Sequence, residues 1–325
     1  MNHISQLIEN ISIGEAMSHE GLTVFPLLGK VPFAKDYLTL DEALAADTAV
    51  ITEVSESGSV PQLLFRNKGG QAVFLLDGEE LVGAKQNRIL NITILAPAMK
   101  DTVIPVSCVE AGRWSHSSPD FKPAPRAQFA DSRAKRCMQV SASMESTGER
   151  RSDQGEVWDD ISCKLSSLGS RSSTQAVESA FRDNEDTLAG FVDKLAANDR
   201  QAGGIFCING RITGMEIFDS QNTCEKLMPK VIRSYALDAI DPRFAKEAPA
   251  GEPSPQDFLS RLAEVKYHQA DAVGEGIDLR LRTSSGLAGG ALYARDRIVH
   301  LVAFALRENT MHSSDRVHRR RSFWR

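Results

Sequence analysis

A dense run of polar side chains between residues 77 and 88 offers more chemistry than any other part of the sequence. Seven of these twelve residues are charged or carry an amide, namely Asp77, Glu79, Glu80, Lys85, Gln86, Asn87 and Arg88. Gly78 and Gly83 lie among them and give the backbone conformational freedom. Carboxylates, amides and a guanidinium held close together suit bidentate recognition of phosphate or carboxylate, or carboxylate-assisted chemistry on a sugar. The alternative is a solvated hairpin tip with incidental ion pairs, and composition alone favours that alternative.

A second group of reactive or polar side chains follows the next expected strand and consists of Cys108, Glu110, Arg113 and Trp114. Glu110 and Arg113 stand at a strand end, and Trp114 could stack on a flat ligand. The alternative is a structural salt bridge beside a core tryptophan, and the group taken alone favours it. Cys108 lies inside an apolar strand, which is more typical of a buried thiol than of a nucleophile.

The common catalytic and metal-binding motifs are absent from the sequence. It contains no G-x-S-x-G elbow, no H-E-x-x-H, no P-loop and no G-x-G-x-x-G that opens a helix. Its seven histidines are scattered, and no two of its five cysteines lie within metal-ligand spacing. We therefore expect no metal site, no cofactor and reduced thiols, as in a cytoplasmic protein.

The strands of a sheet in the first third of the chain must position these polar groups. Short β-rich runs predict strands at 49–54, 62–66, 71–76, 88–95 and 103–109. The segment Asn67-Lys-Gly-Gly70 is a hairpin signal between the second and third runs. Several strands with short connections favour an antiparallel sheet or sandwich over βαβ units.

The middle of the chain turns helical. Asp153 and Glu156 predict a capping box for a helix that ends at Gly169. Gln154 and Trp158 are four residues apart, so they share one face of this helix, where a tryptophan is more often part of the core. A further helical pattern begins near Ser172 and breaks around residues 183–186, which indicates two helices or one kinked helix.

Strands return in the last third of the chain. The run 204–218 predicts a hairpin whose turn is Asn209-Gly210. Helical patterns follow around Leu227 and around Phe258, and the apolar run 298–305 is expected to pair with the main sheet because it is too hydrophobic to stand alone.

The whole sequence indicates an α+β protein with an antiparallel β-sheet or sandwich core and flanking helices. We expect one domain over residues 1–306, with a Pro-rich linker loop near 248–255 and a basic, disordered tail at 307–325. The formal net charge is −5 and the part before the tail is acidic, so nucleic acid is not the expected partner. No apolar run is long enough to span a bilayer and the N-terminus lacks a signal-peptide pattern, so a cytoplasmic protein without membrane contact is expected.

Taken together, the motifs resemble the ARG and Rhodanese-Phosphatase-superfamily-associated protein domain family, in which ARG denotes ADP-ribosylglycohydrolase. The likeness runs from about residue 10 to about residue 305 and is carried by Gly78-Glu-Glu-Leu-Val-Gly-Ala-Lys-Gln-Asn-Arg88, Ile104-Pro-Val-Ser-Cys-Val-Glu110, Gly112-Arg-Trp114, Ser152-Asp-Gln154 and Val157-Trp158. The family is largely uncharacterised, so the resemblance indicates identity better than activity. Its name records an association with ADP-ribose-removing and phosphatase-like enzymes, which is associational evidence for a role near NAD-derived nucleotides.

The resemblance implies that the polar cluster is functional, whereas composition alone favours a solvated hairpin tip with incidental ion pairs. The implied function is binding or processing of an ADP-ribose-like or other NAD-derived nucleotide. The implied ligand-binding residues are Lys85, Gln86, Asn87, Arg88, Arg113, Trp114 and Gln154. If the protein is an enzyme, the candidate general acids or bases are Glu79, Glu80 and Glu110, because burial can raise the pKa of a carboxyl group into the working range.

Two alternatives stay open at this point. The same carboxylates could be held ionised by Arg88 and Arg113, which would favour binding over catalysis. The protein could also be a non-enzymatic structural or protein-interaction module, in which the cluster is an architectural ion-pair network and the partner is not identified by sequence. A functional cluster should open into a pocket, whereas an architectural one should be closed.

Overall fold

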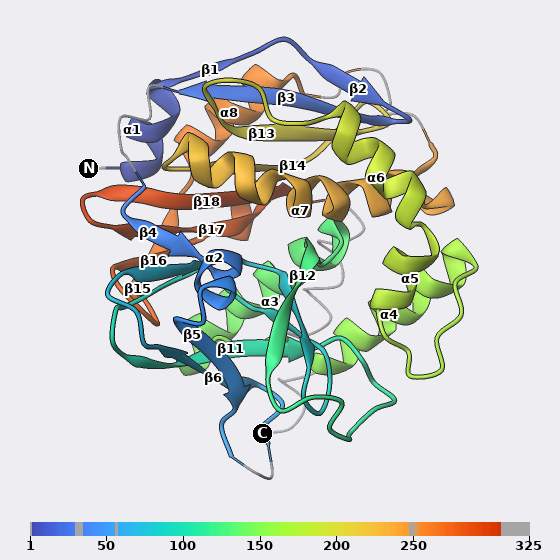
Figure 1. Cartoon of the computed structure of the whole chain (residues 1–325). Coiled ribbons are helices and arrows are strands. Elements are labelled where there is room, and N and C mark those ends of the chain that lie inside the picture. The colour runs from blue at the N-terminus through green and yellow to red at the C-terminus, as the bar shows by residue number, and fades with distance from the viewer. Residues whose placement is uncertain (1, 30–34, 56–57, 247–250, 252, 307–325) are drawn as a thin grey trace, which may run out of the picture.

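The chain has an α+β fold built on three sheets. The computed structural model describes residues 2–29, 35–55, 58–246, 251 and 253–306 (Figure 1). The strands are antiparallel except where β4 (Tyr37–Thr39) pairs in parallel with β7 (Ala72–Leu75). This confirms the expected fold class. The expected tail at 307–325 and half of the expected linker at 248–255 lie outside the described residues.

The largest sheet has nine strands in the order β1-β3-β13-β14-β18-β17-β16-β15, with β2 also paired to β3. Its strands are β1 (Ile11–Ile13), β2 (Met17–His19), β3 (Leu22–Gly29), β13 (Gln201–Ile208), β14 (Arg211–Phe218), β15 (Tyr267–Asp271), β16 (Ile277–Leu281), β17 (Leu287–Ala294) and β18 (Arg297–Ala305). Figure 1 shows this sheet in the upper half of the molecule, where β3 from near the N-terminus lies beside β13 from much later in the chain. The sheet therefore depends on pairings between residues far apart in sequence.

Both faces of this sheet are covered, as alternation along its strands requires. In β13, Ile205 and Cys207 face one core, which also holds residues of α1 (His3–Glu9) and α8 (Pro255–Ala263). Phe206 faces the other core, where α7 (Gln221–Ala239) crosses the sheet. One face is therefore covered by two helices from opposite ends of the sequence, and the other face is covered by α7.

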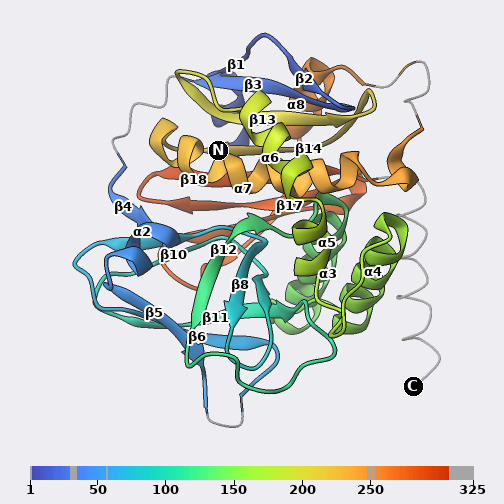
Figure 2. The same cartoon turned by 45° about the vertical axis from the view of Figure 1, so that its right-hand side comes forward.

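The remaining strands form two smaller sheets in the lower half of the molecule (Figure 2). One sheet has the order β12-β8-β9-β11-β6-β5, with bounds β12 (Phe121–Ala127), β8 (Glu79–Gly83), β9 (Arg88–Leu90), β11 (Asp101–Cys108), β6 (Gln62–Asn67) and β5 (Ala49–Glu53). The other has the order β10-β7-β4, in which β10 is Ile94–Ala96, and α2 (Leu40–Ala45) follows β4. The polar run 77–88 thus begins before β8 and ends at the first residue of β9.

Helix α3 (Ala130–Thr147) lies between the nine-stranded sheet and the smaller sheets. It packs against β17 and β18, while its Val140 joins the core of the smaller sheets. The sequence did not predict this helix. Its buried face carries Arg133, Arg136 and Cys137 in place of a plain apolar stripe, so the usual periodicity of a helix is hidden.

Several elements appear where the sequence predicts them. Asn209 and Gly210 have positive φ angles of 50° and 80°, as the turn of a tight hairpin between β13 and β14 requires. Strand β18 pairs with both β14 and β17, so the apolar run near the C-terminal end joins the main sheet. The helical break is also confirmed, because α5 (Glu178–Asp183) ends just before α6 (Glu185–Lys194) begins.

Other predictions differ from the structure in detail. The expected strand 88–95 is two strands in two sheets, because Asn91 bonds to Ser107 and the chain then crosses to the sheet of β7. The expected capping box of α4 (Gln154–Leu168) is only half formed. Asp153 accepts from the first-turn amides, but the Glu156 side chain bonds to Gln139 instead of returning to the cap.

A closed ring of buried polar contacts joins the sheets. Asp77 bonds to Arg133 and Arg136 of α3, with its Oδ1 2.9 Å from Arg136 Nη2 and 3.4 Å from Arg133 Nε. Arg133 Nη1 lies 2.6 Å from Glu216 Oε1 in β14, and Glu216 Oε2 lies 2.8 Å from His300 Nε2 in β18. The ring closes through Thr93, whose hydroxyl contacts His300 Nδ1 and accepts from the Asp77 backbone amide. The solvated-hairpin alternative for this part of the chain is therefore wrong.

No helix within the described part of the chain is both long and apolar enough to cross a membrane. All five cysteines are free thiols, and Cys163 alone among them is exposed.

Replacing Asp77 with Asn should destabilise the fold strongly. Loss of this charge leaves the buried Arg133 and Arg136 without their shared counter-ion, and breaking a buried pair in this way costs about 3–5 kcal/mol. The matched control is Asp101→Asn in β11, whose pair with Arg66 is half-exposed and should contribute less than about 1 kcal/mol. Urea unfolding at neutral pH measures both free energies. Equal losses in the two variants would show that the ring does not hold the sheets together.

The Asp77 contribution should also depend on pH. Burial raises the pKa of Asp77, but the charges of Arg136 and Arg133 outweigh burial and hold the pKa below its usual value. The stabilisation is then complete above the unfolded-state pKa of about 3.9 and is lost as pH falls towards the lower folded-state value. The difference in unfolding free energy between wild type and Asp77→Asn should be constant above about pH 5 and shrink below about pH 4. A difference that grows on acidification would contradict this account.

Candidate functional site

The acidic half of the polar run is occupied by ion pairs inside the molecule. Glu79 Oε1 lies 2.5 Å from Lys230 Nζ, which also lies 2.6 Å from Asp41. Glu80 receives two bonds from Arg126, at 2.6 Å and 3.2 Å. Burial raises the pKa of Glu79 although the Lys230 ammonium opposes this. Neither carboxylate reaches the surface, so this half joins β8 to α7 and β12.

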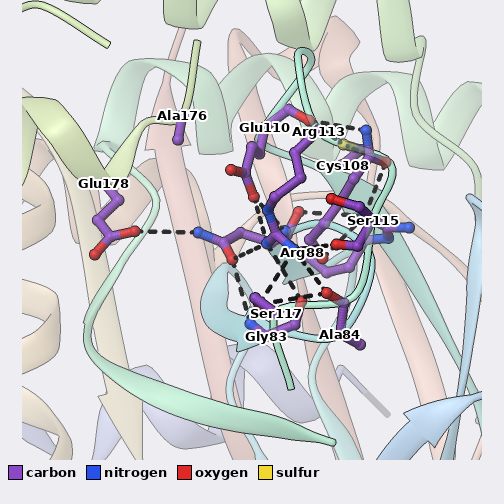
Figure 3. A network of polar contacts seen from close by, with 12 residues as sticks. Gly83, Ala84, Arg88, Cys108, Glu110, Arg113, Ser115, Ser117, Ala176 and Glu178 are labelled. Atoms are coloured by element: carbon purple, nitrogen blue, oxygen red, sulfur yellow. Dashed lines mark hydrogen bonds and ion pairs between the residues drawn. The ribbon is translucent and has the colours of Figure 1, made fainter. Parts of the chain in front are cut away.

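The second half of the run, from Ala84 to Arg88, is held in place by Arg113 (Figure 3). The Arg113 guanidinium donates to Glu110 Oε2 at 2.6 Å, to Asn87 Oδ1 at 3.1 Å and to the Ala84 carbonyl at 2.6 Å. Glu110 also accepts from the Asn87 backbone amide at 3.1 Å. Burial raises the pKa of Glu110, but the bonds from Arg113 and Asn87 outweigh it and lower the pKa. An ionised Glu110 with these partners acts as an anchor for the loop.

Three amide side chains predicted to bind ligand are engaged by the protein itself. The Gln154 side chain accepts from the Cys108 backbone amide and donates to the Cys108 carbonyl, both at 2.8 Å. It thus makes the pair of bonds that a residue of a neighbouring strand would make. Gln86 Nε2 donates to the Glu110 carbonyl at 2.9 Å. Asn87 Nδ2 donates to Glu178 at 3.3 Å. Their geometry favours a role in shaping the site over direct contact with a ligand.

Arg88 differs from its neighbours because two of its three guanidinium nitrogens have no hydrogen-bond partner among the described residues. The residue has no exposed surface, and its Nη1 donates to the carbonyl and the Oε1 of Gln86 at 3.1 Å. Its Nε and Nη2 are buried and have no hydrogen-bond acceptor among the described residues. Burial lowers the pKa of Arg88 from its usual value. Because an unsatisfied buried donor costs about 1–3 kcal/mol, and more on a charged group, this arrangement calls for an explanation.

Trp114 lies next to the buried Arg88 and is itself exposed at the protein surface. Its indole is 49% exposed, although large apolar side chains are usually covered. The Arg88 Cζ lies 5.7 Å from the centre of the Trp114 ring, and Lys85 Nζ lies 5.5 Å from the same centre. Both distances allow cation–π attraction. Arg88 and Lys85 therefore both lie close to the Trp114 ring.

The structure adds Glu53, which the sequence did not indicate. Glu53 is the last residue of β5, and both of its carboxylate oxygens are inaccessible and without a hydrogen-bond partner in the described chain. Its charge acts on Arg88. The only feature of the sequence that could have identified Glu53 as a candidate site residue is its position at the end of a strand.

Cys108 lies beside Arg88 but is not arranged as a nucleophile. Its thiol donates to Gln86 Oε1 and to the Glu110 carbonyl, and burial raises its pKa despite the nearby Arg88. A protonated, buried thiol is a poor nucleophile. No three His, Cys, Asp or Glu side chains within the described ranges gather in a way that could hold a metal ion.

The comparison with protein families gives a match to the ARG and Rhodanese-Phosphatase-superfamily-associated Protein domain over residues 10–304. This range includes both halves of the polar run as well as Glu53, Trp114 and the ring around Asp77. No curated protein matches the chain, and no solved structure matches it.

Replacing Arg113 with Ala should loosen the loop that carries Arg88. The change removes bonds to Glu110, to Asn87 and to the Ala84 carbonyl, and leaves buried acceptors unpaired, at a cost of about 2–4 kcal/mol. Hydrogen exchange at the backbone amides of 84–88 should accelerate in parallel. Arg182→Ala, which removes an exposed pair with Asp183, should change stability by less than about 0.5 kcal/mol. Unchanged exchange in the Arg113 variant would refute the clamp.

Proposed function

The chain belongs to the ARG and Rhodanese-Phosphatase-superfamily-associated Protein domain family, and we propose that it binds an ADP-ribose-like, NAD-derived nucleotide against Arg88 and Trp114. The family description supports the ligand class by association only, because association between genes says nothing of mechanism. The observation that carries the proposal is physical: Arg88 is fully buried, and two of its donor nitrogens have no acceptor within the part of the chain that the structure describes.

A phosphate or pyrophosphate supplies what Arg88 lacks. Guanidinium groups bind phosphate oxygens through two parallel N–H···O bonds, and the Nε and Nη2 of Arg88 form one edge of the group that can donate in this way. Lys85 adds a second positive charge near the Trp114 ring. Burial strengthens such bonds, because little water competes for the donors.

Trp114 supplies a flat apolar surface next to these charges. An aromatic ring exposed by half can stack on a purine, and its burial by a ligand removes apolar area from water. The pairing of an aromatic face with the buried Arg88 and the partly exposed Lys85 matches a nucleotide, which has a flat base at one end and phosphates at the other.

Binding is favoured over catalysis by the state of the three candidate carboxylates. Glu79 and Glu80 are enclosed in ion pairs away from Trp114, and Glu110 is held ionised by Arg113. A general acid must carry a proton and reach the substrate. The roles of these residues as acids or bases stay predictions, and their geometry supports anchoring.

The competing proposal is that the whole polar cluster is architectural. The closed ring around Asp77 favours that view for the acidic half. It would require Arg88 to stabilise the fold as well, so the two proposals differ in what loss of the Arg88 charge does to stability.

Replacing Arg88 with Met should abolish ligand binding and leave stability within about 1 kcal/mol of wild type. Exchange of a buried charge for an apolar group of similar length is often neutral or stabilising, the more so here because two donors are unsatisfied. With ADP-ribose at 100 times its dissociation constant, wild type should gain about 2.7 kcal/mol of unfolding free energy. Chemical unfolding with and without ADP-ribose measures both effects.

Arg66→Met is the matched control, because Arg66 is half-exposed on β6 and paired with Asp101. It should keep the full ligand effect. The proposal is excluded if wild type gains nothing from ADP-ribose, NAD or related nucleotides. A large loss of stability in the Arg88 variant, with ligand binding retained, would support the architectural alternative.

A further inference from the structure

Two oppositely charged side chains in the same part of the molecule have buried polar atoms without a hydrogen-bond partner among the described residues. Arg88 presents two buried donor nitrogens, and Glu53 presents two buried acceptor oxygens. The two side chains do not bond to each other, although opposite charges in a low-dielectric interior attract strongly. Such a separation is expensive for a protein to maintain unless something lies between the groups for part of its working cycle.

Glu53 reaches the same space as Lys85 and Trp114. A Cβ placed on Gly58 would lie 3.3 Å from Glu53 Oε2 and 3.3 Å from the Cδ of Lys85, so both side chains border one small volume. Lys85 and Arg88 in turn both lie against the Trp114 ring. The electrostatic influence of Glu53 on Arg88 agrees with this neighbourhood.

The chemistry of the two groups restricts the ligand. A carboxylate accepts only, so a partner of Glu53 must bring donors, and two neighbouring hydroxyl groups match its two oxygens. A partner of Arg88 must bring acceptors, which a phosphate does. Acidic side chains hold ribose hydroxyls in the same manner in dinucleotide-binding sheets, although the fold there is different.

We infer that Glu53 is a specificity-determining residue that binds the vicinal hydroxyl pair of a phosphorylated sugar, while Arg88 binds its phosphate. The inference rests on the proposed function, because it assumes that Arg88 binds phosphate. It goes further in selecting sugar phosphates over bare anions. Inorganic phosphate or a dicarboxylate would satisfy Arg88 and leave Glu53 both unpaired and close to a second negative charge.

Calorimetric titration with ribose 5-phosphate and 2-deoxyribose 5-phosphate tests the inference. Wild type should bind ribose 5-phosphate at least tenfold more tightly, since hydrogen bonds to a charged group discriminate by roughly this factor or more. Glu53→Gln should reduce the preference to less than about threefold, because the amide accepts through one oxygen only. Its affinity for 2-deoxyribose 5-phosphate should stay close to that of wild type.

Glu145→Gln, at an exposed position on α3, is the matched control and should keep the preference. If Glu53→Gln does not fold, Glu53→Asp retains the charge with a shorter reach and should likewise lose the preference. Equal affinity of wild type for the two sugars, or no binding of either, overturns the role of Glu53. Loss of ADP-ribose binding on Arg88→Met shows separately whether the proposed function holds.

Discussion

The contact on which the rest of the structure depends is the pair of arginines around Asp77. This carboxylate lies where the nine-stranded sheet, the two smaller sheets and α3 meet, and it has almost no access to water. An ionised group in such a place must be paired, so Arg133 and Arg136 are confined to one side of α3. Gly78 next to it has a φ of +78°, and a Cβ there would lie 2.6 Å from Arg133 Nε, so only glycine allows the arginine to approach.

The ring around Asp77 fixes where the polar run begins, and the Arg113 clamp fixes where it ends. Between these anchors, the run divides into an enclosed acidic half and a half that ends beneath Trp114. The carboxylates of the first half are paired within the protein, whereas in the second half two guanidinium nitrogens of Arg88 have no acceptor among the residues that the structure describes. This division explains how one stretch of twelve residues can stabilise the fold through its first half and, under the proposed function, bind a ligand through its second half.

The sequence predicts local features well and long-range ones poorly. The Asn209-Gly210 turn and the apolar strand β18 follow from backbone preference and hydrophobicity, which are properties of the segment itself. Helix α3 could not be predicted in the same way, because its buried arginines are partnered by residues of β14 and of the turn before β8. The amides of Gln86 and Gln154 are polar groups of the kind that ligands use, yet their partners are backbone groups that only the folded chain brings near. Glu53 carries no motif at all.

The most direct test of this division is an NMR measurement of arginine Nε–H resonances, assigned by single Arg→Lys replacements, during titration with ADP-ribose. The account predicts that the Arg88 resonance moves downfield as its Nε gains an acceptor. The resonances of Arg126 and Arg133 should stay in place, because their Nε atoms already donate to Glu80 and Asp77 inside the protein. The opposite pattern, or an Arg88 resonance that does not move at saturating ADP-ribose, would contradict the claim that Arg88 is the ligand-facing charge of the cluster.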